Sequence, residues 1–466
     1  MKKIIHAAIN GQKGFEGKGY LFNGENYIRY DWDKDRPDAN YPKKLNLWKL
    51  KGGFAKGIDA AINGQKKFEG YGYLFKGGKY VTYDWVKDAP VGNPKSLNLW
   101  KLKGDFLNGI DAACNGKGKY DDYGYLFKGN KYVRYHWDKD APSDDKLRDI
   151  SLWKLPAMFN QGVDGAIDGG GRFSNFTYFF KGDQYARYDW KRHVGEGPFS
   201  ISKWWRIENR LEAKATELYK AFGLKDKIDF QAFRLGYLGY ETIGQGCAIP
   251  NVTKKNRKGH KETVTYNNAS GYLSIIDFTK PSNEPRLVVL NMLTQTQRSY
   301  LHVSHGVNSS GRGAERLYAR HFTNTPNTNK SSLGFFVTGW PFPQDKVKNG
   351  VTEKRVWMKL HGLEPGINDN AQGRGIMMHT ARYVSETTGM AGTSHGCPAT
   401  DAFENKVVKG KRVNLLYEEI KNGSLLFQYT DRAHASDEKG VNYFDHSNLI
   451  PCLEKAAADS FGIRKP

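Results

Sequence analysis

The chain has 466 residues, more than one hydrophobic core usually supports, so its length predicts two or three domains. Aromatic residues make up 14% of it, and this abundance of Tyr and Trp argues against a helical bundle and predicts a mainly β protein. The formal charge of +22 favours an acidic or polyanionic partner. No segment has the apolar core of a signal peptide or the length of a membrane span, so we expect a soluble chain whose export route is not visible.

Four repeated units fill residues 1–207. Each unit opens with a short motif that recurs every 52 or 53 residues: Ile5-His6-Ala7-Ala8, Ile58-Asp59-Ala60-Ala61, Ile110-Asp111-Ala112-Ala113 and Val163-Asp164-Gly165-Ala166. An aromatic strand, a Gly turn, a second strand ending in Trp and a further Trp follow in every unit. Such strands predict antiparallel hairpins, and repeats of this period stack radially into propeller blades.

The repeat resembles the hemopexin repeat, whose family folds as a four-bladed β-propeller. The resemblance rests on the Asp-Ala-Ala, Tyr-Phe-Phe-Lys-Gly and Arg-Tyr-Asp pieces. It implies that Asp59, Asp111 and Asp164 line a central channel near a bound structural cation, whereas His6 departs from the pattern. The alternative is that these residues only join the blades. With one propeller, haem binding is not expected, and a binding or targeting module is the favoured interpretation.

The chain changes character after residue 207. Apolar residues at helical spacing between Leu211 and Phe222, and a second set from Ile228 to Tyr237, predict a helical junction over 208–271. The basic stretch 253–261 predicts a mobile, solvated loop rather than a nucleic-acid contact. Residues 272–466 form the last predicted domain, a mainly β sandwich or barrel with strands at 272–278, 286–291, 299–306, 332–339 and 355–360.

The chemistry of this last domain centres on His379 and Cys397. A cysteine attacks a carbonyl carbon as the thiolate, which a neighbouring imidazole can generate. Gly396 allows a tight turn, and backbone N–H groups there could stabilise an oxyanion. The alternative for every cysteine is a buried structural thiol, and Cys247 and Cys452 could form at most one bridge.

The arrangement of His379 followed by Ser394-His395-Gly396-Cys397 is similar to the active-site signature of the L,D-transpeptidases, cysteine enzymes that remodel peptidoglycan. Residues from about 216 to 432 resemble the murein L,D-transpeptidase catalytic domain. Further ordered matches support this resemblance: Ser274-Ile275-Ile276-Asp277-Phe278 with Lys280-Pro281-Ser282, His305-Gly306-Val307-Asn308-Ser309, Ser331-Ser332-Leu333-Gly334-Phe335, Gly362-Leu363-Glu364, Asn368-Asp369-Asn370-Ala371 with Arg374, and Gly396-Cys397-Pro398-Ala399.

The resemblance implies acyl transfer through a Cys397 thioester on tetrapeptide stems, with His379 as the base. An amine acceptor would give cross-linking or D-amino-acid exchange, and water would give carboxypeptidase trimming. The pocket would be formed by Ser394, His395, Gly396, Thr380 and Arg374, with Thr380 standing where a glycine commonly follows the histidine. Catalysis is expected to need no cofactor and no metal, since the histidines lack zinc-ligand spacing.

The expected partners are peptidoglycan stem peptides and, through the propeller, a cell-surface or secretion-apparatus component. The expected location is the periplasm or the outside of the cell, by a route that the sequence does not reveal. One alternative is a secreted antibacterial effector toxin with the same chemistry, and another is a non-enzymatic cell-surface binding protein. A nucleic-acid partner rests on charge alone and is not expected.

Overall fold

The computed structural model describes residues 3–247, 251–255, 261–266, 268–348, 350–437 and 439–464. The chain divides into two compact units, which are Met1–Arg210 together with Ala457–Pro466, and Leu211–Ala456. It therefore leaves the first unit after Arg210 and returns to it at Ala457. The sequence-based division had assigned all of 272–466 to one domain, so residues 457–466 are placed differently by the structure.

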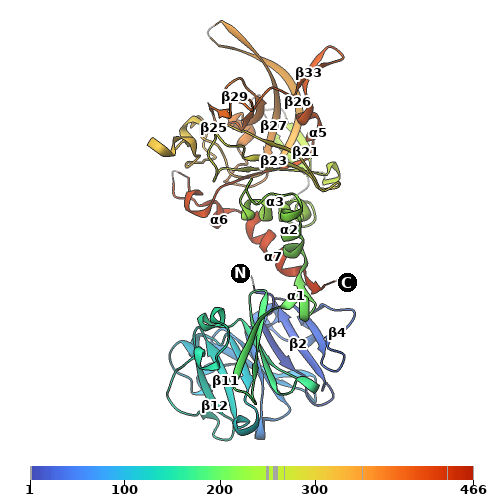
Figure 1. Cartoon of the computed structure of the whole chain (residues 1–466), viewed down its shortest axis with the longest axis vertical. Helices are drawn as coiled ribbons and strands as arrows, with labels where there is room; N and C mark the ends of the chain where they lie inside the picture. The colour runs from blue at the N-terminus through green and yellow to red at the C-terminus, as the bar shows by residue number, and fades with distance from the viewer. Residues whose placement is uncertain are drawn as a thin grey trace. The chain divides into compact units, whose positions relative to one another are not determined.

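The first unit contains four antiparallel sheets, one for each sequence repeat (Figure 1). Their strands are β1 (Ala7–Asn10), β2 (Lys18–Asn23), β3 (Asn26–Asp31), β4 (Arg36–Pro37) and β5 (Lys43–Lys44); β6 (Ala60–Asn63), β7 (Tyr71–Lys76), β8 (Lys79–Asp84) and β9 (Ala89–Ser96); β10 (Ala112–Asn115), β11 (Tyr123–Lys128), β12 (Lys131–His136), β13 (Ala141–Pro142) and β14 (Arg148–Asp149); β15 (Gly165–Asp168), β16 (Phe176–Lys181), β17 (Gln184–Asp189) and β18 (Val194–Ser200). In every sheet the first four strands follow one another in chain order, while the short β5 and β14 pair with β3 and β12.

The four sheets close into a ring. The first strand of each sheet contacts the first strand of the next, and β15 contacts β1. One tryptophan per repeat packs on a tyrosine of the following sheet, with ring centroids 4.7 to 4.8 Å apart: Trp48 on Tyr83, Trp100 on Tyr135, Trp153 on Tyr188 and Trp205 on Tyr30. The last pair joins the fourth repeat to the first. The predicted four-bladed β-propeller is therefore confirmed.

Short helical turns connect the blades. They include η1 (Leu45–Trp48), η2 (Gly52–Lys56), η4 (Leu97–Trp100), η5 (Gly104–Asn108), η7 (Ile150–Trp153), η8 (Ala157–Gln161) and α1 (Ile201–Trp204). The four packed tryptophans end η1, η4 and η7 or directly follow α1. After the fourth blade, β19 (Ile207–Asn209) pairs antiparallel with β36 (Phe461–Ile463), so the returning chain end is hydrogen-bonded into the propeller unit. Phe461 is buried in the same apolar cluster as Trp205 and Ile207.

The second unit is built on an eight-stranded, barrel-like sheet (Figure 1). Its strand order is β24 (Thr296–Leu301), β23 (Leu287–Asn291), β22 (Tyr272–Asp277), β35 (Leu425–Tyr429), β26 (Gly334–Lys348), β27 (Val351–Gly362), β28 (Met377–Thr380) and β32 (Ala399–Thr400). The strands predicted at 272–278, 286–291 and 355–360 are confirmed. The central β35 was not predicted, although its five residues are all buried.

Shorter elements surround this sheet. The strand pairs are β25 (His305–Gly306) with β31 (Thr393–Ser394), β29 (Val384–Ser385) with β30 (Met390–Ala391), and β33 (Asn405–Val408) with β34 (Lys411–Asn414). The helices are α4 (Ala371–Arg374), α5 (Leu415–Glu419), α6 (Tyr443–His446) and α7 (Leu449–Asp459).

The predicted helical junction is part of the second unit. It forms α2 (Arg210–Ala221) and α3 (Phe230–Thr242), and α3 packs directly on the sheet. A Cβ atom at Gly236 would meet Ile275 at 2.9 Å, and one at Gly239 would meet Phe335 at 2.4 Å. The glycines therefore let this helix approach the strands closely.

The basic stretch that was predicted as a mobile loop contributes strand residues at both of its ends. Its flanks form an antiparallel hairpin of β20 (Asn251–Lys255) and β21 (Lys261–Thr265), while residues 256–260 lie outside the described residues. Lys359 forms an ion pair with Glu262 of β21, which ties the hairpin to β27.

Cys247 and Cys452 form a disulfide within the second unit. The bridge joins the segment after α3 to α7, so it connects positions 205 residues apart in the chain. The other two cysteines, Cys114 and Cys397, are free and buried. Within the described ranges, no helix is long and apolar enough to cross a membrane.

Candidate active site

The predicted base lies on a strand of the second unit, and the predicted nucleophile lies in the turn before the neighbouring strand. His379 is in β28, and Cys397 precedes β32. These two strands pair in parallel with His379 opposite Ala399, and the His379 N–H donates to the Pro398 carbonyl at 3.2 Å. The fold thus brings the histidine strand beside the cysteine turn.

The turn before Cys397 is held by a serine. Ser394 Oγ accepts a hydrogen bond from the Gly396 N–H at 3.1 Å and donates to the Cys397 carbonyl at 2.6 Å. Gly396 has φ of 112°, and a Cβ atom there would lie 2.6 Å from the Lys330 carbonyl oxygen. Only glycine fits this position without strain.

Two more serines fix the same turn from neighbouring segments. Ser331 Oγ donates to the Gly396 carbonyl at 3.4 Å, and Ser304 Oγ donates to the Cys397 carbonyl at 3.4 Å. Ser304 Oγ also accepts from the Ala399 N–H at 3.1 Å. The carbonyl groups of Gly396 and Cys397 therefore both accept hydrogen bonds from serine hydroxyls.

The thiol of Cys397 is in a mostly apolar, buried site. Its Sγ accepts from the Met377 N–H at 3.5 Å and lies 3.6 Å from the Gly375 carbonyl oxygen, to which the thiol donates. Burial raises the pKa of the Cys397 thiol, and the Met377 N–H and the Arg374 charge oppose this rise. At neutral pH the resting group is therefore the protonated thiol.

The imidazole of His379 is buried beside a cation. Burial, together with the charge of Arg355, lowers its pKa to about 4, although a hydrogen bond to the Thr380 carbonyl opposes the shift. The imidazole is therefore neutral near pH 7. The Nδ1 atom lies 3.1 Å from the Thr380 oxygen and 3.4 Å from Arg355 Nη1. The shorter contact favours a proton on Nδ1, which leaves the Nε2 lone pair to act as a base.

Three side chains that the sequence did not single out surround this imidazole. Trp357 lies with its ring centroid 4.3 Å from that of His379, and Tyr383 lies 6.5 Å away. The Arg355 guanidinium is over both aromatic rings, and its Nε is buried with no partner among the described residues. The strand 355–360 was predicted, but only its pairing with β28 places Trp357 opposite His379.

The remaining predicted pocket residues have different surroundings. Thr380 is buried, and its Oγ1 accepts from the Val356 N–H at 3.0 Å, so it joins β28 to β27. Arg374 donates to the carbonyls of Thr323 and Lys330, each at 2.6 Å, and thereby fixes the segment that packs on Gly396. The side chain of His395 is exposed.

A hydrogen bond between His379 and the Cys397 thiol is not among the contacts of the described residues. The structure instead contains a neutral imidazole on β28 and a neutral thiol in the turn before the neighbouring β32. The Cys397 N–H makes no hydrogen bond within the described part of the chain, whereas the Gly396 N–H is occupied by Ser394. Of the two predicted oxyanion donors, the Cys397 N–H is thus the one available to a substrate.

The three channel aspartates of the propeller each bind the turn of their own blade. Asp59 accepts from the Gly77 N–H at 2.8 Å, Asp111 from Gly129 at 2.8 Å and Asp164 from Gly182 at 2.7 Å. Each carboxylate also pairs with a lysine: Lys76, Lys128 or Lys3. The Asp59 and Asp111 contacts each lie within one blade, whereas Lys3 of the first repeat pairs with Asp164 of the fourth. Over the described residues, no group of three or more His, Cys, Asp or Glu side chains is arranged to hold a metal ion.

Comparison with known families agrees with this division of the chain. Residues 247–429 match the family described as L,D-transpeptidase catalytic domain. The second unit contains an L,D-transpeptidase-family catalytic domain. The L,D-transpeptidase match spans both His379 and Cys397, and residues 167–207, the last propeller repeat, match the hemopexin family.

Two curated relatives of this chain are both named Albumin-2. Albumin-2 of Pisum sativum is 37% identical over 87 residues, which is 18% of this chain and only 35% of the length of that relative. Albumin-2 of Lathyrus sativus is 26% identical over 204 residues, or 39% of this chain and 84% of that protein.

Two solved structures are similar to the propeller. The hemopexin fold protein CP4 from cow pea has a TM-score of 0.37 at 23% identity and corresponds to 44% of this chain and 96% of its own. LS24, a seed albumin from Lathyrus sativus, has a TM-score of 0.35 at 23% identity over 44% of this chain and 96% of its own.

Proposed function

We propose that the protein is a cysteine L,D-transpeptidase that acts on the tetrapeptide stems of peptidoglycan. The observation that carries this proposal is the placement of His379 on β28, beside the turn that holds Cys397 just before the parallel strand β32, within the segment that matches the catalytic domain family. The three serines around the Cys397 turn hold the nucleophile in one backbone conformation. Such preorganisation lowers the cost of reaching the transition state.

In the first half-reaction, the Cys397 sulfur attacks the carbonyl carbon of the third stem residue. His379 Nε2 takes the thiol proton as the C–S bond forms, and the Cys397 N–H donates to the oxyanion. When the peptide bond breaks, the imidazolium returns that proton to the nitrogen of the leaving D-amino acid. The products are a thioester on Cys397 and a free D-amino acid.

In the second half-reaction, an amine attacks the thioester and His379 accepts its proton. The thiolate leaves as the new amide forms and is then protonated. An amine of another stem gives a cross-link, and a free D-amino acid gives exchange. Water in place of the amine gives a trimmed stem, which is the carboxypeptidase outcome.

The disulfide supports a location outside the cytoplasm. Disulfides persist in oxidising compartments such as the periplasm and the extracellular space, and the Cys247–Cys452 bridge lies in the same unit as the catalytic pair. We infer that the enzyme works in the periplasm or outside the cell. The propeller then serves as a module that binds the enzyme to its surroundings.

The proposed chemistry is tested by acylation with a carbapenem. Intact-protein mass spectrometry is expected to find one covalent adduct, and peptide mapping is expected to place it on Cys397. The Cys397→Ala variant should form none. The Cys114→Ala variant, which removes the other free buried thiol, should react like the natural chain. A folded protein that stays unmodified, or an adduct that persists in Cys397→Ala, would contradict the proposal.

The fate of the thioester is measured on isolated peptidoglycan. Sacculi incubated with the protein are digested, and the muropeptides are identified by mass spectrometry. New cross-links between third residues, replaced terminal residues or shortened stems distinguish the three outcomes. An unchanged muropeptide profile would favour the non-enzymatic binding protein instead.

A further inference from the structure

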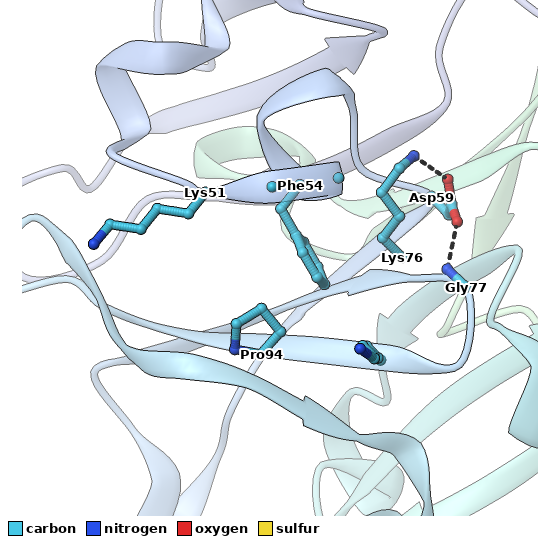
Figure 2. A pocket seen from close by; sticks show the side chains of 9 residues that line it. Lys51, Phe54, Asp59, Lys76, Gly77 and Pro94 are labelled. Atoms are coloured by element: carbon cyan, nitrogen blue, oxygen red, sulfur yellow. Dashed lines mark hydrogen bonds and ion pairs between the residues drawn. The ribbon is translucent and has the colours of Figure 1, made fainter.

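The second blade of the propeller carries a groove of about 690 Å³. Its lining comes from η2 and from the strands β7, β8 and β9, and Figure 2 shows Phe54 between Lys51 and Lys76 with Pro94 below them. The lining residues are Lys51, Gly52, Gly53, Phe54, Asp59, Lys76, Gly77, Lys79 and Pro94. Three lysines therefore face one groove that contains a single carboxylate.

That carboxylate is already engaged. Asp59 binds the Lys76 ammonium at 3.2 Å and the Gly77 N–H at 2.8 Å, as Figure 2 shows. Lys51 and Lys79 are exposed, and neither forms an ion pair or a side-chain hydrogen bond within the described part of the chain. The groove thus has two ammonium groups that no protein group neutralises, which favours an anion in it.

In the third blade, acidic side chains neutralise the lysines at the corresponding positions. Lys103 and Lys131 stand where Lys51 and Lys79 stand one repeat earlier. Lys103 pairs with Asp145 at 2.8 Å, and Lys131 pairs with Asp149 at 3.1 Å. The third blade therefore repeats the lysines but supplies an acid for each one.

A single position accounts for the difference at Lys79. Lys79 lies opposite Ser96 in the β8–β9 pair, just as Lys131 lies opposite Asp149 in the third blade. Ser96 and Asp149 also have the same local role, because each accepts a backbone N–H at the start of the following helical turn. A serine there caps the turn but leaves the lysine charge free. The strand β9 (Ala89–Ser96) has no acidic residue.

The exposure of the residues that line the groove limits the class of ligand that it can bind. Phe54 is only 4% exposed, so no aromatic face is available for a nucleic-acid base to stack on. Pro94 is an exposed apolar lining residue, but the groove has no exposed aromatic ring of the kind that dominates most protein interfaces. Flexible ammonium groups beside the exposed Gly52–Gly53 backbone suit a hydrophilic chain that carries hydroxyl and acidic groups.

We propose that the blade-2 groove binds the acidic groups of an anionic cell-wall polysaccharide. Lys51 and Lys79 form ion pairs with carboxylate or phosphate oxygens of the polymer, while Lys76 stays paired with Asp59. This assignment rests on the proposed function for the choice of a cell-wall polymer. The site itself rests on the unpaired lysines and the groove.

The test uses the full chain and two acidic probes. Oligogalacturonate supplies carboxylates, oligo(glycerol phosphate) supplies phosphodiesters, and neutral dextran is the uncharged control. Isothermal titration calorimetry is expected to detect binding of at least one acidic probe, weakening as salt rises, and none of dextran. The probe bound more tightly identifies the acidic group. Failure of both acidic probes to bind at low salt would overturn the proposal.

Matched variants locate the binding site. The Lys51→Ala/Lys79→Ala double variant should raise the Kd about tenfold, since it removes two ion pairs. Lys103→Ala/Lys131→Ala removes the same charge from the third blade and should change the Kd less than about twofold. Equal losses in the two double variants, or a duplex DNA that competes equally well in both, would show general charge attraction and overturn the proposal.

A charge-matched substitution tests the role of Ser96. Ser96→Asp recreates the third-blade arrangement, keeps the cap and should neutralise Lys79, so we expect the Kd to rise about threefold. An unchanged Kd would contradict a role for Lys79. Binding is also measured with Cys397→Ala. That variant should bind normally, so loss of wall chemistry and loss of polysaccharide binding are separate results.

Discussion

At the residue scale, the surroundings of His379 and Cys397 determine the protonation state of the proposed catalytic pair. Cys397 lies in a turn that three serine hydroxyls hold, and His379 lies under Trp357 beside Arg355. Both reactive groups are neutral at rest because burial opposes their charged forms. In the proposed mechanism, proton transfer between them therefore occurs as the substrate carbonyl is attacked.

The acidity of His379 gives a testable pH profile. Its pKa of about 4 means that the neutral imidazole, the form that acts as a base, persists until the pH falls to about 4. The rate of carbapenem acylation should therefore fall only below that pH, where His379 is protonated and no longer acts as a base. Replacing Arg355 by Gln removes a cation beside the ring, so the pKa of His379 should rise and the acidic limb should move to higher pH.

The measurement is the acylation rate from pH 3 upward, followed by mass spectrometry. Arg432→Gln is the control, because Arg432 is an exposed arginine of the same unit that pairs with Asp445. That variant should leave the limb in place. An acidic limb that stays unchanged in Arg355→Gln would refute the electrostatic role of Arg355.

At the scale of elements, α3 packs closely on the sheet and forms part of the core of the second unit. Gly236 and Gly239 face Ile275 and Phe335, where no side chain fits. Gly239→Ala should therefore destabilise the second unit by about 1–3 kcal/mol, because the added methyl overlaps the Phe335 ring. Thermal unfolding measures this loss. At the exposed Gln231 on the same helix, an alanine should be neutral or slightly stabilising, and equal losses at both positions would contradict the packing argument.

Elements were predictable from sequence where a local pattern repeated or alternated. The propeller followed from its period, and the strands leading to His379 followed from apolar alternation. The hydrogen bonds of Ser304 and Ser331 to the catalytic turn were not predictable, because they depend on which strands become neighbours. The same holds for β36, a three-residue strand whose partner β19 lies some 250 positions earlier.

Two arginines have surroundings in the structure that the sequence did not predict. Arg374 appeared as a pocket residue, yet its guanidinium is bound by two backbone carbonyls. Arg355, in contrast, was not predicted from the sequence to lie beside His379. A charged residue at the start of a strand looks solvent-facing until strand pairing buries it against a histidine. Local patterns identify elements, but such contacts arise from tertiary pairing.

At the scale of the whole molecule, the disulfide lies entirely in the second unit and closes a long loop. Reduction should therefore lower the melting temperature of that unit while leaving the propeller transition in place. The loss expected for a disulfide is about 2–4 kcal/mol. Calorimetry with and without reductant measures it. The Cys247→Ser variant should have the melting temperature of the reduced protein, and reductant should not change it. A shift in the propeller transition would contradict the assignment of the disulfide's effect to the second unit.

The pairing of β19 with β36 has a consequence for how the two units can be separated. The catalytic unit is an insertion between two strands of one small sheet, and the Arg210 N–H bonds the Ser460 carbonyl at 3.2 Å. Removal of residues 211–456 would leave two chain ends already held together, which a short linker could join. We therefore expect that the second unit can be excised or exchanged at this one site, whereas a cut after residue 207 would also remove β36 and most of β19.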